Sequence, residues 1–93
     1  MKRAKLDVDS LSDDELREVI SDALRRYGGD CMPLREFVDF LRREYGLSRE
    51  EASRLWFRAV KRKVASVGIA LVEGVGLCTV IRLAEEEPVD VIY

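Results

Sequence analysis

The spacing of apolar residues changes once along this chain, and the change falls at Gly68. Before Gly68, apolar residues recur at the spacing of helices that bury one face. After it, apolar runs stand on either side of Glu73-Gly74-Val75-Gly76, which is typical of two strands joined by a tight turn. The chain has 93 residues with no linker and no internal repeat, which fits one domain. The predicted fold class is therefore α+β, with helices first and a β-hairpin last.

Three helices are predicted, and each has a recognisable start. Ser12 and Ser48 are each followed three residues later by a glutamate, which is the spacing of a capping box. Pro33 suits the first position of the helix between them, because its missing N–H has no partner there anyway. The expected ends of the three helices are Gly28-Gly29, Gly46 and Ala65.

The predicted hairpin turns at Gly74-Val75, because glycine favours the first position of a two-residue type II′ turn. This turn pairs Val72 with Leu77 and leaves both faces of the hairpin largely apolar. A half-exposed antiparallel sheet normally alternates apolar with polar residues, so the second face needs a cover. The sequence leaves three covers open: the segment 89–93 of the same chain, the same segment of a neighbour, or a dimer interface.

The chain contains no His, no Asn and no Gln, and its two cysteines are Cys31 and Cys78. A structural zinc site needs four ligands of the Cys or His type, so no such metal centre is predicted. Chemistry that needs an imidazole is excluded as well. With no nucleophile–base pair and no phosphate-binding glycine loop, we expect neither an enzyme nor a cofactor. Free thiols are expected, and the sequence also allows a disulfide between them.

The missing amides also bear on origin and location. High charge with few amides is a trend of thermophilic proteins, so we expect a thermophilic prokaryote, an archaeon, as the source. No apolar run approaches the ~20 residues of a membrane span, and no signal peptide precedes the first helix. The expected location is the cytoplasm, or the nucleoid if the protein binds DNA, with no membrane contact.

Three helices followed by a hairpin, with a tight turn at Tyr45-Gly46-Leu47-Ser48, resemble the winged helix-turn-helix family. The resemblance extends from Leu11 to Leu83 and rests on element order, loop lengths and apolar spacing. It implies a three-helix bundle, a hairpin wing at 68–83 and a short third strand near residues 30–32. The domain boundaries expected from it are 1–9 for a flexible basic arm, 10–84 for the winged-helix domain, and 85–93 for an acidic and then apolar tail.

In that family the helix after the turn enters the major groove of DNA. Here the segment 48–65 carries six basic side chains against two acidic ones, whereas 66–93 carries one against five. Arg and Lys neutralise phosphates, Arg reads guanine, and Glu or Ser contacts other base edges. The DNA-binding residues predicted on this helix are Arg49, Glu50, Ser53, Arg54, Phe57, Arg58, Lys61 and Arg62. Lys2, Arg3 and Lys5 of the arm are expected to add phosphate contacts.

A second hypothesis follows from the charge of the rest of the chain. The formal net charge is −2, and the expected wing tip at 73–76 has no basic residue, whereas DNA-gripping wings often carry Arg or Lys. The alternative function is therefore a winged-helix protein–protein interaction module or dimeric scaffold. It would use the apolar hairpin and the C-terminal tail, and its expected partner is a second copy of the chain.

Overall fold

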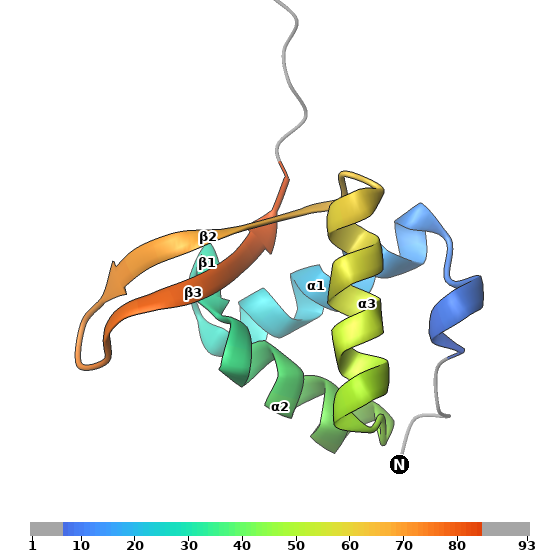
Figure 1. Ribbon diagram of the computed structural model, residues 1–93, viewed down its shortest axis with the longest axis horizontal. Coiled ribbons are helices and arrows are strands. Elements are labelled where there is room, and N and C mark those ends of the chain that lie inside the picture. Colours follow the sequence, from blue (N-terminus) through green and yellow to red (C-terminus); the bar gives the residue numbers. More distant parts are fainter. Residues whose placement is uncertain (1–6, 85–93) are drawn as a thin grey trace, which may run out of the picture.

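The computed structural model describes residues 7–84 and has an α+β fold (Figure 1). Three helices pack together, and a three-stranded antiparallel sheet in the order β1-β3-β2 lies against them. The hairpin of β2 and β3 projects beyond the helices on one side, as Figure 1 shows. The elements in chain order are η1 (Val8–Ser10), α1 (Asp13–Tyr27), β1 (Cys31–Pro33), α2 (Leu34–Tyr45), α3 (Arg49–Lys61), β2 (Ala65–Val72) and β3 (Gly76–Leu83).

Both predicted capping boxes are confirmed. The hydroxyls of Ser12 and Ser48 each accept a hydrogen bond of 3.1 Å from the backbone N–H three residues on. The glutamate at that position accepts one of 2.8 Å from the serine's own N–H. Gly28 and Gly46 end α1 and α2 with φ of +93° and +69°, a left-handed conformation that glycine adopts without steric cost. Local chemistry therefore determines where α1 and α3 begin and where α1 and α2 end.

The core lies between the three helices and the base of the hairpin. No polar or charged residue among those described is buried. Hydrophobic burial therefore holds the helices against the sheet, since apolar area removed from water is the main stabilising contribution. The largest side chains with almost no exposure are Phe37, Leu16, Ile20, Leu41, Leu55, Ile81 and Val64.

Two predicted boundaries near β1 differ slightly from the structure. The short strand expected near residues 30–32 is Cys31–Pro33, and it pairs with β3. Pro33 is the N-cap residue of α2 and not its first helical residue, because its backbone is extended, with ψ of 138°. Cys31 and Cys78 are half-buried free thiols, as expected.

The expectation that the third helix runs from Ser48 to Ala65 is wrong at its C-terminal end. α3 stops at Lys61, and Ala65 already belongs to β2. Lys63 has φ of +62°, and its N–H bonds to the carbonyl of Val60 while the next N–H bonds to that of Ala59. This is a Schellman motif, which normally has glycine at the left-handed position. No glycine marks the end in the sequence, so the helix was predicted too long.

Replacing Lys63 by glycine is expected to raise the free energy of unfolding by ~1 kcal/mol. A residue with a Cβ atom loses about 1–2 kcal/mol in the left-handed conformation, and glycine does not. Urea denaturation at neutral pH measures the change. The matched control is Lys61→Gly, inside α3, which is expected to lower stability by about 1 kcal/mol. Equal losses in both variants would contradict the strain assigned to Lys63.

The hairpin register also differs from the prediction. The strands pair Val72 with Gly76 and Leu71 with Leu77, so the loop has three residues, Glu73 to Val75, and not two. The register is shifted by one residue, so each side chain of β2 shares its face with a different set of β3 side chains than predicted. Ile69, Leu71 and Leu77 therefore share one face.

The expected flexible arm, 1–9, overlaps the residues that the structure describes. Val8 is buried and belongs to η1, which packs against α3, so the folded region begins before residue 10. Residues 7–10 are polar apart from Val8, so their sequence gives little sign of burial. Lys2, Arg3 and Lys5 lie outside the described residues, and so does the tail 85–93.

Candidate nucleic-acid interface

The outer surface of α3 carries the predicted DNA-binding residues, but not all of them are equally accessible. Arg49, Glu50 and Arg54 are exposed, and Lys61 is exposed at the last position of the helix. Phe57 lies between them with 55 % of its surface exposed. The remaining predicted residues are exposed Arg62 and half-buried Ser53 and Arg58.

The N-terminal segment 7–13 binds three of the arginines on one flank of α3. The Arg54 guanidinium lies 3.7 Å from the Asp9 carboxylate. Arg58 donates a hydrogen bond of 3.1 Å from Nη2 to the backbone carbonyl of Leu11. Arg62 donates from Nε to the Asp13 carboxylate. Arg58 and Arg62 are therefore held by hydrogen bonds within the chain, whereas the Arg54–Asp9 pair is longer and both of its side chains are exposed.

Arg58 departs most from the prediction. Its Nε atom is buried and has no hydrogen-bond partner among the described residues, while its Nη2 atom is bonded to Leu11. A guanidinium fixed in this way is not free to reach a base edge. The helical spacing placed Arg58 on the outward face, and only the position of residues 7–13 shows that this face is partly covered. Arg58 is therefore a structural contact between α3 and the N-terminal segment.

The Asp13–Arg62 pair alters the charge behaviour of both groups. The hydrogen bond from Arg62 holds the pKa of Asp13 below its usual value, and the same bond raises the pKa of Arg62. A carboxylate with a lowered pKa in the folded state stabilises the fold above its ordinary pKa and stops doing so as acid protonates it. At neutral pH the charged Asp13 side chain therefore binds Arg62 and also interacts favourably with the dipole of α1, since it lies in the first turn of that helix.

Phe57 forms the centre of the accessible part of α3. The Lys61 Nζ atom lies 5.7 Å from the centroid of the Phe57 ring, within the range of a cation–π contact. The Trp56 ring meets it edge-on, with 6.1 Å between centroids. The surface around Phe57 combines an aromatic ring with positive charge, which suits a ligand that is both anionic and flat or apolar.

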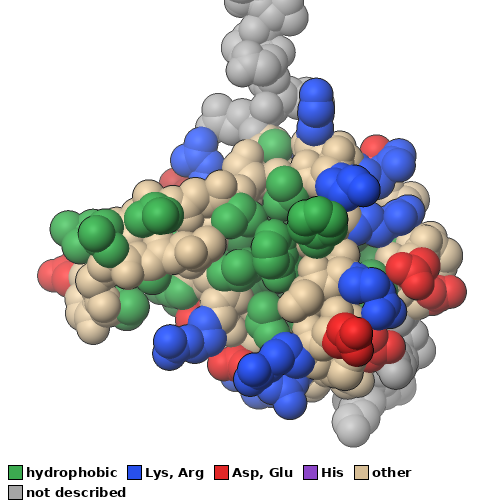
Figure 2. Space-filling view, viewed as in Figure 1, with side chains coloured by type: hydrophobic (Ala, Val, Ile, Leu, Met, Phe, Trp, Pro, Cys, Tyr) green, Lys and Arg blue, Asp and Glu red, His purple; other side chains and the backbone are tan. Residues whose placement is uncertain are grey.

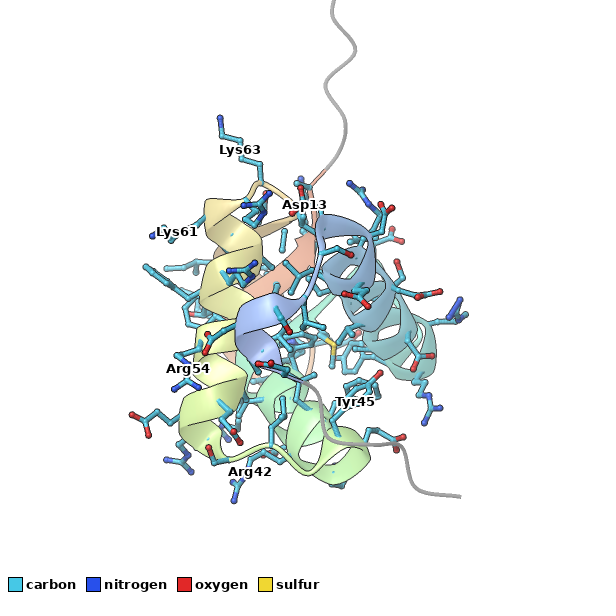
Figure 3. The ribbon with its side chains drawn as sticks, turned by 90° about the vertical axis from the view of Figure 1, so that its right-hand side faces the viewer. Asp13, Arg42, Tyr45, Arg54, Lys61 and Lys63 are labelled. Carbon is cyan, nitrogen blue, oxygen red and sulfur yellow. The ribbon has the colours of Figure 1, made fainter. Side chains whose placement is uncertain are left out.

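Positive side chains continue beyond the predicted set. Figure 3 shows Lys63, Lys61, Arg54 and Arg42 one below another along the length of α3. Arg42 and Lys63 were not predicted as site residues, because Arg42 belongs to α2 and Lys63 follows the helix. Figure 2 shows basic side chains around the right-hand and lower sides of the molecule, with hydrophobic side chains between α3 and the hairpin.

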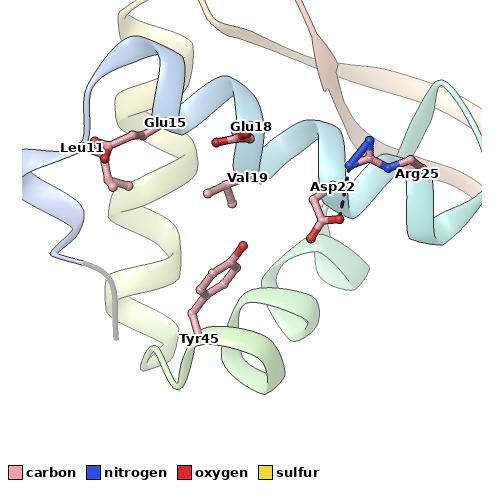
Figure 4. Close-up of a pocket in the computed structure, with 7 residues that line it drawn as sticks. All are labelled: Leu11, Glu15, Glu18, Val19, Asp22, Arg25 and Tyr45. Carbon is pink, nitrogen blue, oxygen red and sulfur yellow. Dashed lines mark hydrogen bonds and ion pairs between the residues drawn. The ribbon is translucent and has the colours of Figure 1, made fainter. Parts of the chain in front are cut away.

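A hollow away from α3 lies between α1 and the end of α2 (Figure 4). It has a volume of about 370 Å³, and Tyr45 points into it from α2. Three carboxylates from α1 line it, but Glu15 belongs to the capping box and Asp22 lies 3.4 Å from Arg25. Glu15 and Asp22 thus serve local structure, and we assign the hollow no catalytic role.

Residues 7–84 contain neither a cluster of metal ligands nor a membrane-spanning helix. No three His, Cys, Asp or Glu side chains come together there as metal ligands would. Over the same residues, no helix combines the length and the hydrophobicity that crossing a bilayer requires.

Comparison with known proteins does not identify a family or a function. No family model, no curated protein and no solved structure matches the chain. The functional interpretation therefore depends on the geometry around α3 and the hairpin.

Proposed function

We propose that this chain is a small winged-helix protein that binds double-stranded DNA with α3 in the major groove. Three helices and a three-stranded antiparallel sheet in the order β1-β3-β2 are compatible with that fold. The turn Gly46–Ser48 joins α2 to α3 in the place of the helix-turn-helix turn. A transcriptional regulator or a chromosome-associated factor of a thermophilic prokaryote is the role that this implies.

The observation that carries the proposal is the line of cations along α3. Lys63, Lys61, Arg54 and Arg42 lie along one side of the molecule in Figure 3. A helix of the length of α3 spans ~20 Å, and the major groove is about 12 Å wide. Cations at the two ends of the helix would therefore reach phosphates on both sides of the groove, which positions the helix between the strands.

Base readout would be limited by the residue types at the site. Without Asn or Gln, the bidentate recognition of adenine is missing. Arg49 and Arg54 are the exposed arginines of α3 that could bond guanine, and Glu50 is the exposed acceptor for cytosine. Arg58 is withdrawn from this set because it is bonded to Leu11. We therefore propose weakly specific binding with a preference for guanine-containing sites.

The binding test is a salt titration of affinity for a duplex, followed by fluorescence anisotropy. About four phosphate contacts give a slope of log K against log salt of roughly −3 to −4, because each contact releases condensed counterions. The double substitution Arg54→Ala with Lys61→Ala is expected to reduce the slope by about 2. Circular dichroism checks that this variant folds.

The control removes equal charge from α1, with Arg17→Ala and Arg25→Ala, and is expected to leave the slope within about 0.5 of the parent. Phosphate contacts are strong at about 20–50 mM salt, so an absence of binding there would rule out the proposal. An equal decrease of the slope in the α1 variant would show that DNA is attracted by the overall charge and not by α3.

A protein–protein interaction module is the second candidate, and one observation favours it. The accessible centre of α3 is the Phe57 ring, and the wing tip carries the acidic Glu73 with no basic residue in the loop. Binding to an apolar protein surface would depend little on salt, whereas phosphate binding depends on it steeply. The same titration, with Phe57→Ala as a third variant, therefore distinguishes the two functions.

A further inference from the structure

No strand within residues 7–84 pairs with the outer edge of β2. The sheet order β1-β3-β2 leaves β2 on the outside, and eight successive residues pair with β3 on its inner side without a bulge. Those eight residues, Ala65–Val72, include no charged residue and no proline. Natural proteins normally blunt such edges with Lys, Pro, bulges or a covering element. Within the described part of the chain, half of the backbone N–H and C=O groups of β2 thus have no strand partner.

One face of the same hairpin is apolar and exposed. Ile69, Leu71 and Leu77 share this face and have exposed fractions of 75 %, 77 % and 74 %. Toward the base, the face continues into Val67, which packs against the core. Figure 2 shows hydrophobic side chains at the far end of the hairpin and again between the hairpin and α3. An exposed contiguous apolar face marks an interaction surface more often than a solvated one.

The two ends of β2 carry opposite charges. Lys63 lies two residues before the strand, and Glu73 follows it directly. Both side chains are exposed, and neither forms an ion pair with another described residue. A strand that is basic at its beginning, uncharged along its length and acidic at its end is complementary to a second copy of itself in the antiparallel direction.

We propose that β2 pairs with β2 of a second copy of this chain, antiparallel and about a two-fold axis at Gly68. In this register Gly68 faces Gly68 of the other copy, and Lys63 faces Glu73 of the other copy. Odd-numbered residues then face odd-numbered residues, so Ile69 lies opposite Val67 of the second copy on the same side. The apolar faces of both hairpins join into one surface across a single sheet, since antiparallel partners project to the same side.

A second copy fits this edge better than the chain's own C-terminal segment. β3 runs from the tip of the hairpin to its base, so a segment turning back after Ala84 would run in the same direction as β2. Parallel pairing is slightly less stable per residue, and it needs a crossover connection. A two-fold antiparallel pair of identical strands needs no crossover connection, and its symmetry repeats the contact between Lys63 and Glu73 at both ends. The proposal does not depend on DNA binding.

The test is analytical ultracentrifugation of the full chain, without DNA and at low salt, over a range of concentrations. A reversible monomer–dimer equilibrium is expected. Glu73→Lys and Lys63→Glu are each expected to weaken the dimer about tenfold, because each replaces two symmetric attractive contacts by repulsive ones. The variant with both substitutions restores opposite charges and is expected to dimerise within about threefold of the parent.

Control variants carry the same charge changes on α1, where Glu18→Lys and Arg17→Glu are expected to leave the equilibrium unchanged. A shortened chain that ends at Ala84 is expected to dimerise as the full chain does. A monomer at all concentrations, or a dimer that ignores both exchanges, would refute the proposal. So would a monomer that becomes a dimer on removal of 85–93, because the tail would then be the occupant of β2. Since no DNA is present, these outcomes are separate from failure of the DNA-binding proposal.

Discussion

Replacing Phe37 by alanine is expected to lower the free energy of unfolding by about 3–5 kcal/mol, the usual range for truncating a buried aromatic. Phe37 is fully buried on α2, in the core between the helices and the sheet. The loss combines the transfer of the ring from water with the cavity left behind, which close-packed neighbours fill only partly. Since small domains are stable by only about 5–15 kcal/mol, this substitution removes a large share of the total.

Urea denaturation followed by circular dichroism measures the effect, with Phe57→Ala as the matched control. Phe57 has the same side chain on the neighbouring helix α3, but more than half of its surface is exposed. Its removal is expected to cost less than about 1 kcal/mol, since it loses one cation–π and one edge contact. Similar losses in both variants would mean that Phe57 lies in the core, which would overturn the description of α3 as an accessible surface.

Leu11→Ala is expected to cost about 2–5 kcal/mol, the second largest effect. Leu11 is buried although it precedes α1, and it stands at the position whose side chain packs against Leu16 in a hydrophobic staple. Its backbone carbonyl also accepts the hydrogen bond from Arg58. The N-terminal segment is therefore held by burial first and by ionic contacts second, because exposed ion pairs contribute only about 0–1 kcal/mol each.

The same exchange at Leu71, on the exposed face of the hairpin, is the control and is expected to change stability by less than about 0.5 kcal/mol at low protein concentration. Chemical denaturation of both variants gives the comparison directly. A small loss for Leu11→Ala would indicate that residues 7–13 detach easily. Arg58 and Arg62 would then be free to bind phosphate, and the covered flank of α3 would count as part of the interface.

Local features of the fold could be predicted because their causes lie within a few residues of each other. The capping boxes at Ser12 and Ser48 and the glycine at Gly46 are such cases, and helix starts and turns followed from them. The short strand at Cys31–Pro33 came from the resemblance and not from its own three residues. On α3, spacing correctly indicated that Arg54 and Lys61 face outward.

The features that could not be predicted depend on contacts between distant parts of the chain. Leu11 and Arg58 are separated by 47 positions, and nothing in the spacing of α3 shows that a polar segment from the N-terminus will cover one flank. The end of α3 was missed for another reason. Lys63 adopts a conformation that its residue type disfavours, and tertiary packing of Val64 into the core outweighs that local preference.

The number of residues in the hairpin loop, more than the type of the strand residues, decides which side of the hairpin is apolar. β3 is held between β1 and β2, so its own orientation is fixed by pairing on both edges. A two-residue loop at 74–75 in the same sequence would pair odd positions of β2 with even positions of β3, whereas the three-residue loop pairs odd with odd. Ile69 and Leu71 could then no longer share a side with Leu77. A substitution in 73–75 that favours the two-residue loop would therefore change the apolar surface, even with every strand residue kept.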